Sequence, residues 1–223
     1  MQARTRILGM ATAACALLAI LAGPGALAMP GLLYLAKPLA TVLVILHAWP
    51  RADGAARLRH WVLMGLVLSL IGDVALLWPR QGFLPGLVAF LLAHLSYAMA
   101  FTRDTRLAAV PAAFALYALV AGGLLVVLWP GLPEALQLPV LAYVACLATM
   151  AAQAGARWWS RRGAADARLR RRAALGAALF VCSDALLAVD RFRAPLPAAA
   201  FWILGTYWLA QWCIASALPP RRA

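Results

Sequence analysis

The sequence predicts an all-α fold, a polytopic membrane helical bundle of about eight transmembrane helices with both termini cytoplasmic. Composition is the first reason: of 223 residues, 65% are hydrophobic and 12% are charged, whereas a soluble domain is about half apolar and about a quarter charged. Length is the second reason, because a spanning helix takes ~20 residues and eight spans with short loops use the whole chain. We therefore expect a single transmembrane domain over residues 1–223. The protein would be an integral, multi-pass membrane protein, in the cell (inner) membrane if it is bacterial.

Eight apolar runs, each bounded by a charge, a proline or a glycine, are the predicted helices. They cover residues 7–23, 31–49, 60–78, 83–101, 107–129, 135–156, 173–190 and 196–218. In chain order they begin directly after Arg6, Pro30, Arg59, Gly82, Arg106, Glu134, Arg172 and Pro195. They end at or shortly before Gly23, Pro50, Pro79, Arg103, Pro130, Arg157, Arg191 and Pro219. Each run is close to the length that a spanning helix requires.

The distribution of basic residues is the third reason for a membrane fold. With the N-terminus in the cytoplasm, 16 of the 20 basic residues, including Arg221 and Arg222, fall on the cytoplasmic side. Three fall on the opposite side, and Lys37 lies inside the second run. An excess of this kind sets orientation in membrane proteins. It explains the net charge of +13, so we expect the lipid bilayer as a partner and no nucleic acid.

Two segments outside the membrane interior have more than one interpretation. Arg4, the apolar run after it and Ala26-Leu27-Ala28 imitate a cleavable secretory signal, although we expect a retained helix. The predicted loop at residues 157–172 contains seven arginines and has Trp158 and Trp159 near its start. We expect this loop to anchor the topology, and anionic lipid headgroups would bind it by the same electrostatics.

Four ionisable residues lie inside the predicted spans: Lys37, Asp73, His94 and Asp184, with Asp190 at a rim. Such groups are expensive at membrane depth and are functional candidates by default. At ~1.5 Å rise per residue, Lys37, Asp73 and Asp184 lie about 8–9 Å below the outer ends of their runs. They are therefore predicted to share one layer near the outer face, with His94 deeper.

Small or polar residues recur at helical spacing on five of the runs. These stripes are Tyr34, Lys37 and Thr41; Gly65, Ser69, Gly72 and Asp73; Gly86, Phe90, His94 and Tyr97; Gly176, Ser183 and Asp184; and Tyr207 and Gln211. Their spacing predicts that each stripe faces the bundle interior. Close packing explains the glycines but not the aspartates. The segments that begin at Asp73 and Asp184 also resemble each other, which predicts a weak four-plus-four repeat.

Two carboxylates and an ammonium in one dehydrated layer form an acid–base arrangement. One carboxyl can stay protonated while a cation keeps the other ionised, and the sequence leaves open which is which. Lys37 would either hold its neighbouring aspartate ionised or bind a substrate phosphate. The predicted supporting or substrate-binding residues are Lys37, His94, Ser69, Ser183, Tyr207, Gln211 and Asp190. We expect no metal and no other cofactor, because a hydrolytic zinc site uses three protein ligands and only one histidine, His94, is predicted to be buried.

Five motifs in order resemble the YhhN family of integral membrane proteins, the lysoplasmalogenase group. They are residues 37–41 (KPLAT), 69–74 (SLIGDV), 83–101 around His94, 180–188 (FVCSDALLA) and 206–211 (TYWLAQ). The resemblance covers nearly the whole chain. One departure is Asp190, where the family often has Asn before Arg-Phe.

The resemblance implies an eight-helix hydrolase that cleaves the vinyl ether of lysoplasmalogen to a fatty aldehyde and a glycerophospho-base, with Asp73 and Asp184 as the catalytic pair. The substrate would be a lysophospholipid whose headgroup reaches the outer opening near Arg80 and Arg191. A transporter of small solutes or ions would use the same charged layer without covalent chemistry, and the sequence does not separate the two.

Overall fold

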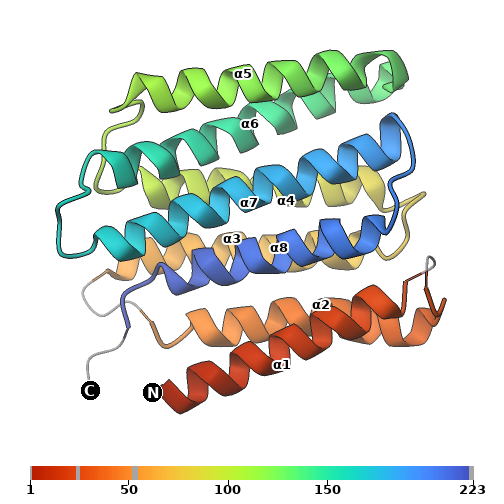
Figure 1. The fold of residues 1–223 in the computed structure, drawn as a ribbon, viewed down its shortest axis with the longest axis horizontal. Coiled ribbons are helices and arrows are strands. Elements are labelled where there is room, and N and C mark those ends of the chain that lie inside the picture. Colours follow the sequence, from red (N-terminus) through yellow and green to blue (C-terminus); the bar gives the residue numbers. More distant parts are fainter. Residues whose placement is uncertain (1, 24–25, 52–54, 221–223) are drawn as a thin grey trace.

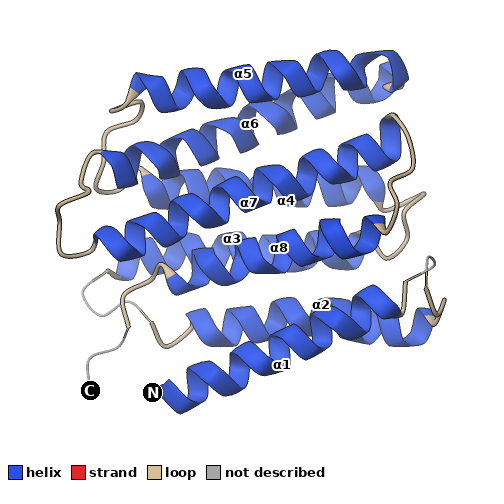
Figure 2. Ribbon diagram, in the orientation of Figure 1, coloured by secondary structure: helices blue, strands red, loops and turns tan. Residues whose placement is uncertain are grey.

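The protein is a bundle of helices that lie side by side and run alternately in opposite directions (Figures 1 and 2). The computed structural model describes residues 2–23, 26–51 and 55–220, and these ranges contain no β-strand. The helices in these ranges are α1 (Gln2–Leu21), α2 (Pro30–Ala48), α3 (Ala56–Ala75), α4 (Phe83–Phe101), α5 (Pro111–Leu128), the 3-10 turn η1 (Trp129–Gly131), α6 (Glu134–Trp159), α7 (Ala167–Phe192) and α8 (Ala199–Ser216). The all-α prediction is confirmed.

Seven of the described helices, α1 to α7, are long and apolar enough to cross a membrane. The eighth, α8, is 18 residues long, but it carries Thr206, Tyr207 and Gln211, which lower its mean hydropathy. Seven of the eight predicted spans are therefore confirmed by length and composition. The eighth forms as an 18-residue helix.

Helices α6 and α7 are longer than predicted, at 26 residues each. The predicted loop at residues 157–172 is wrong for most of its length, because α6 continues through Arg157 and α7 begins before Arg168. Arginine is a good helix former. In addition, the side chains of Arg157 and Arg170 each form an ion pair with Asp104, at 2.8 and 2.9 Å, so the helices continue past the apolar runs.

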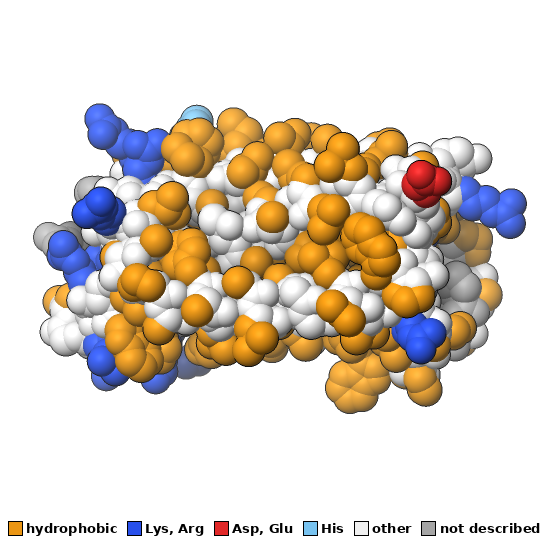
Figure 3. All heavy atoms as spheres, turned by 90° about the horizontal axis from the view of Figure 1, so that it is seen from above, with side chains coloured by type: hydrophobic (Ala, Val, Ile, Leu, Met, Phe, Trp, Pro, Cys, Tyr) orange, Lys and Arg blue, Asp and Glu red, His pale blue; other side chains and the backbone are white. Residues whose placement is uncertain are grey.

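Charged side chains gather at the two ends of the bundle, and apolar side chains cover the face between them (Figure 3). This distribution is the surface expected of a multi-pass membrane protein. Arg221 and Arg222, which the sequence assigns to the cytoplasmic side, lie outside the described residues. The orientation itself stays a prediction.

Glycines allow the close approach of neighbouring helices. A Cβ atom on Gly72 of α3 would lie 2.6 Å from the Phe90 ring of α4, and one on Gly176 of α7 would lie 2.8 Å from the Ala210 carbonyl oxygen of α8. The predicted interior stripes are buried except at Tyr34, which is 41% exposed, and at Asp184, whose side chain is 14% exposed. The prediction is wrong for Tyr34 because it lies near the N-terminal end of α2, where it packs beside Trp78.

Candidate active site

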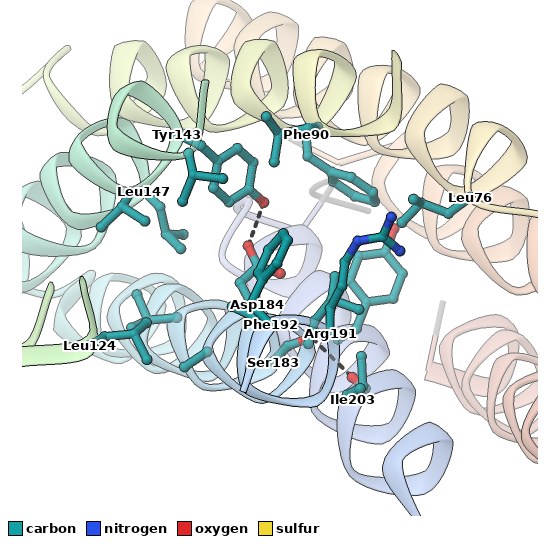
Figure 4. A pocket seen from close by; sticks show the side chains of 18 of the residues that line it. Leu76, Phe90, Leu124, Tyr143, Leu147, Ser183, Asp184, Arg191, Phe192 and Ile203 are labelled. Atoms are coloured by element: carbon teal, nitrogen blue, oxygen red, sulfur yellow. Dashed lines mark hydrogen bonds between the residues drawn. The ribbon is translucent and has the colours of Figure 1, made fainter. Parts of the chain in front are cut away.

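A cavity of about 230 Å³ lies among helices α2 to α8. Its polar lining residues are Lys37, Asp73, Tyr117, Tyr143, Ser183, Asp184, Arg191 and Tyr207. The remaining lining is apolar and includes Leu87, Val120, Leu124, Val144 and Leu147. In Figure 4, Tyr143 and Asp184 are joined by a hydrogen bond beside this space, with Leu147 and Leu124 to one side and Arg191 on the other. The cavity therefore combines a polar part with an apolar extension.

Asp73 is almost completely buried and is held by two hydroxyl groups. Its Oδ2 atom accepts hydrogen bonds from the hydroxyls of Thr41, at 2.6 Å, and Tyr207, at 2.7 Å. The carboxyl is 1% exposed. Three helices, α2, α3 and α8, thus meet at this one oxygen atom.

Other residues form hydrogen bonds with the Thr41 and Tyr207 hydroxyls and fix the direction in which these two hydroxyls donate. The indole N–H of Trp208, which can only donate, lies 3.1 Å from Thr41 Oγ1, so the Thr41 oxygen accepts there and its proton is free for Asp73. Tyr97 donates to Oε1 of Gln211 at 2.7 Å, which leaves the Gln211 amide N–H to donate to the Tyr207 oxygen at 3.2 Å. Both hydroxyl protons consequently face Asp73, an arrangement that suits a carboxylate anion.

Asp184 has a different set of partners. The Tyr143 hydroxyl donates to its Oδ2 at 2.5 Å, and His94 Nε2 lies 3.0 Å from the same hydroxyl and 3.4 Å from Oδ2. The imidazole is fully buried, and its Nδ1 has no hydrogen-bond partner within the described ranges. Imidazole can donate or accept through Nε2, so this chain is compatible with a neutral or an ionised Asp184.

Five of the predicted site residues, Lys37, Asp73, Ser183, Asp184 and Tyr207, line the one cavity. The Lys37 ammonium has no hydrogen bond or ion pair within the described part of the chain, although the residue is only 8% exposed. Ser183 lines the space but donates its hydroxyl to the Ile203 carbonyl oxygen at 3.0 Å, which ties α7 to α8 (Figure 4).

Four other predicted residues do not line the cavity. His94 lies behind Asp184, and Gln211 lies behind Tyr207. The Ser69 hydroxyl is buried without a partner among the described residues. Asp190 accepts a hydrogen bond from the Leu196 backbone N–H at 2.8 Å, so in this structure it holds the connection between α7 and α8.

Sequence reasoning missed two side chains of the site, Tyr143 and Trp208. Tyr143 places a hydroxyl group inside the otherwise apolar run of α6. That unusual hydroxyl is the sequence feature that could have identified Tyr143 as a site residue. Trp208 lies within the 206–211 motif, but nothing in the sequence indicated that its indole contacts Thr41. In the described ranges, no group of three or more His, Cys, Asp or Glu side chains is placed to hold a metal ion.

The match to a family model shows how this chain is related to known proteins. The model of the YhhN family matches residues 32–218. The chain belongs to the YhhN family. No solved structure matches it.

Several relatives within this family are named lysoplasmalogenase. Lysoplasmalogenase TMEM86B of Homo sapiens is 37% identical over 150 residues, which are 66% of this chain and 58% of that protein. Lysoplasmalogenase TMEM86A of Bos taurus is 35% identical over 164 residues, 69% of this chain and 63% of that protein. A lysoplasmalogenase of Mycobacterium tuberculosis is 34% identical over 180 residues, 77% of this chain and 65% of that protein. The match thus covers less than two thirds of the length of each of these relatives.

Proposed function

We propose that this chain is a membrane-embedded hydrolase that cleaves the vinyl ether bond of lysoplasmalogen, or of a related alkenyl lysolipid, to a fatty aldehyde and a glycerophospho-base. The observation that carries the proposal is one cavity in which Asp73 and Asp184 face an apolar extension. A lysolipid has the matching division between a polar glycerol end and an alkyl chain. The relatives named lysoplasmalogenase support the same substrate class.

In the proposed mechanism Asp184 is the general acid. The chain through Tyr143 to His94 can accommodate Asp184 with or without its proton, because the hydroxyl and the imidazole can both reverse their hydrogen bonds. Hydrolysis begins when protonated Asp184 transfers its proton to the vinyl carbon that is not bonded to oxygen. This carbon becomes a methylene group, and the positive charge spreads over the neighbouring carbon and the ether oxygen.

Asp73 is the anion that stabilises this oxocarbenium ion. Its hydrogen bonds from Thr41 and Tyr207 both point toward the carboxylate, and the Lys37 ammonium in the same cavity favours the ionised form. In this proposal Lys37 acts on Asp73. Glycoside hydrolases divide the roles in the same way, with one carboxyl group as the acid and the other as the anion.

Water completes the reaction. The Asp184 carboxylate accepts a proton from the water that adds to the oxocarbenium carbon, which regenerates the acid and gives a hemiacetal. The hemiacetal hydroxyl then gives up its proton as the bond to the glycerol oxygen breaks. The glycerol oxygen takes up a proton and leaves as the alcohol, and the carbon that was bonded to it becomes the aldehyde carbon.

The experiment is to incubate the purified chain in detergent with a lysoplasmalogen and to measure the fatty aldehyde. Asp184→Asn and Asp73→Asn should each lower kcat by about 100-fold or more, because positioned general acids contribute about 10²–10⁴-fold. Asp190→Asn is the matched control, since it removes an acid that does not line the cavity, and it should keep most of the activity.

Absence of aldehyde with the unmodified chain would contradict the proposal. So would turnover that is unchanged in both aspartate variants. Ion or solute flux in liposomes that disappears in Asp73→Asn and Asp184→Asn, without aldehyde formation, would instead identify a transporter.

A further inference from the structure

Arg191 lies at the edge of the cavity, in the last turn of α7, and it lines the cavity although its side chain is exposed. Its guanidinium carbon lies 3.7 Å from the centre of the Phe83 ring, and its Nη2 donates to the Pro79 carbonyl oxygen at 3.4 Å. Figure 4 shows the guanidinium extending across the cavity from α7 toward Leu76. Arg191 and Lys37 are the two cationic residues that line this space.

The charge of Arg191 is not compensated by a carboxylate. None of the ion pairs among the described residues involves Arg191. The neighbouring Asp190 is engaged by the Leu196 backbone N–H, and Asp184 is engaged by Tyr143. Because a guanidinium has five N–H donors and only one of them is used here, at a long distance, several donors remain for an anion.

The position of Arg191 relative to Asp184 suits a phosphate. The two residues are seven positions apart on α7, which is nearly two full turns and about 10 Å of rise, so they lie on nearly the same face. In a 1-alkenyl lysophospholipid, five bonds separate the vinyl ether oxygen from the phosphorus atom, or about 6 Å when extended, taking ordinary bond lengths of ~1.5 Å. With a contact distance added at each end, this length is comparable to the rise along α7 between Asp184 and Arg191.

We propose that Arg191 binds the phosphodiester of the lysolipid and thereby sets the position of the vinyl ether at Asp184. This inference rests on the proposed function and adds to it the residue that recognises the phosphate and thereby discriminates against alkenylglycerols, which lack one. Arginine is suited to this role because its planar donors match phosphate oxygens.

The test compares two substrates, a 1-alkenyl-glycerophosphoethanolamine and the corresponding 1-alkenylglycerol, which lacks the phosphate. Arg191→Gln should raise KM for the phosphate-containing lipid by about 10- to 100-fold, the usual range for a hydrogen bond to a charged group. The same variant should leave KM for the alkenylglycerol nearly unchanged. Arg193→Gln is the matched control, because Arg193 follows α7 and does not line the cavity; it should leave the preference between substrates as it is.

A binding measurement keeps the test independent of turnover. Saturated 1-alkyl analogues, with and without the phosphate, are added to the purified protein at increasing concentration. The thermal unfolding midpoint is measured at each concentration. The phosphate-containing analogue should stabilise the unmodified chain at lower concentration than the alkylglycerol, and Arg191→Gln should remove the difference. Equal losses for both analogues, or for both substrates, would overturn the phosphate role and leave Arg191 as a packing residue on Phe83. If the phosphate preference is found in binding but no vinyl ether is cleaved, the hydrolase proposal fails while the phosphate site stands.

Discussion

At the residue scale, the two aspartates differ in whether the hydrogen-bond direction around them is fixed. Around Asp73, the donor-only indole of Trp208 and the amide of Gln211 fix both hydroxyl protons toward the carboxylate. Around Asp184, the hydroxyl of Tyr143 has an imidazole behind it, which accepts as readily as it donates. A fixed network suits an anion that stays charged, and a reversible one suits a group that loses and regains a proton in each turnover.

Replacing Tyr143 with Phe removes the hydroxyl between Asp184 and His94. We expect kcat to fall about 10- to 100-fold, the size of one hydrogen bond to a charged group, with little change in KM because this hydroxyl acts on the reacting carboxyl. The measurement is steady-state aldehyde release. Tyr117→Phe is the control, since Tyr117 lines the same cavity and its hydroxyl makes no hydrogen bond in the described ranges; equal losses in the two variants would contradict the assigned role.

The sequence predicted the charged residues of the site better than their partners. Asp73, Asp184 and Lys37 are rare at membrane depth, and their depth follows from a constant rise per residue, so their shared layer could be predicted. Tyr143 and Trp208 could not be assigned in this way. Their contribution depends on the rotation of α6 and α8 about their axes, which side-chain periodicity defines poorly in helices that are apolar on most faces.

At the element scale, α5 forms one wall of the apolar part of the cavity. Tyr117, Val120, Ala121 and Leu124 form its cavity-lining stripe, whereas Leu119 is 74% exposed on another face. Helix α5 packs mainly against α6. In the proposed reaction this stripe would contact the alkyl chain of the substrate.

Ala121→Phe should therefore shorten the alkyl chain that the cavity accepts. Excluding about two methylene groups costs about 1.6 kcal/mol at ~0.8 kcal/mol each, or about tenfold in kcat/KM for a long-chain lysolipid. A substrate with a short alkenyl chain should be affected less, and the ratio of the two rates measures this. Leu119→Phe adds a ring on the exposed face and should leave the ratio unchanged; a similar shift in both variants would argue against α5 as the chain-binding wall.

The helices were predictable because each apolar run is bounded by charge, proline or glycine. All eight predicted runs correspond to helices in the described ranges. The extension of α6 and α7 past their apolar runs could not be predicted from hydropathy. It depends on Asp104, which lies in a different loop and is brought close to Arg157 and Arg170 only by the fold.

At the scale of the whole molecule, Asp104 connects three parts of the chain at the end of the bundle where Arg157 and Arg170 lie. Its carboxylate pairs with Arg157 of α6 and with Arg170 of α7, while it follows α4 in the chain. Burial raises the pKa of Asp104, but the hydrogen bonds from Arg157 and the charges of Arg157 and Arg170 outweigh it, so the pKa lies below its ordinary value. Both arginines are at least 95% buried, at 4% and 5% exposure. Among the described residues Arg157 pairs with Asp104 alone, whereas Arg170 also pairs with Asp166.

Asp104→Asn should destabilise the bundle by about 2 kcal/mol near pH 7, because it leaves the buried Arg157 guanidinium with a neutral partner and removes one of the two carboxylates that pair with Arg170. For a chain of this size the thermal midpoint should fall by about 4–8 °C in detergent. Since the folded pKa is lowered, this stabilisation is present above the ordinary carboxyl pKa of about 4 and is lost as the pH falls toward the folded value. The difference from the unmodified chain should shrink accordingly in acid.

Asp166→Asn is the matched control for this prediction. Asp166 pairs only with Arg170, four residues away, and its side chain is 41% exposed, so its loss should cost about 0.5 kcal/mol or less. Equal effects of the two substitutions would show that the connection between loop, α6 and α7 adds nothing beyond a surface ion pair.

The separation of the cavity into a polar part beside Arg191 and an apolar part beside α5 also bears on how the products depart. In the proposed reaction, one amphiphile is divided into a water-soluble glycerophospho-base and an oily aldehyde. The first would diffuse into the aqueous compartment at the outer face, and the second would dissolve in the hydrocarbon of the bilayer. Because the two products would enter different solvents, their concentrations at the site would stay low together. Partitioning itself would therefore make the reverse reaction negligible and the cleavage effectively irreversible.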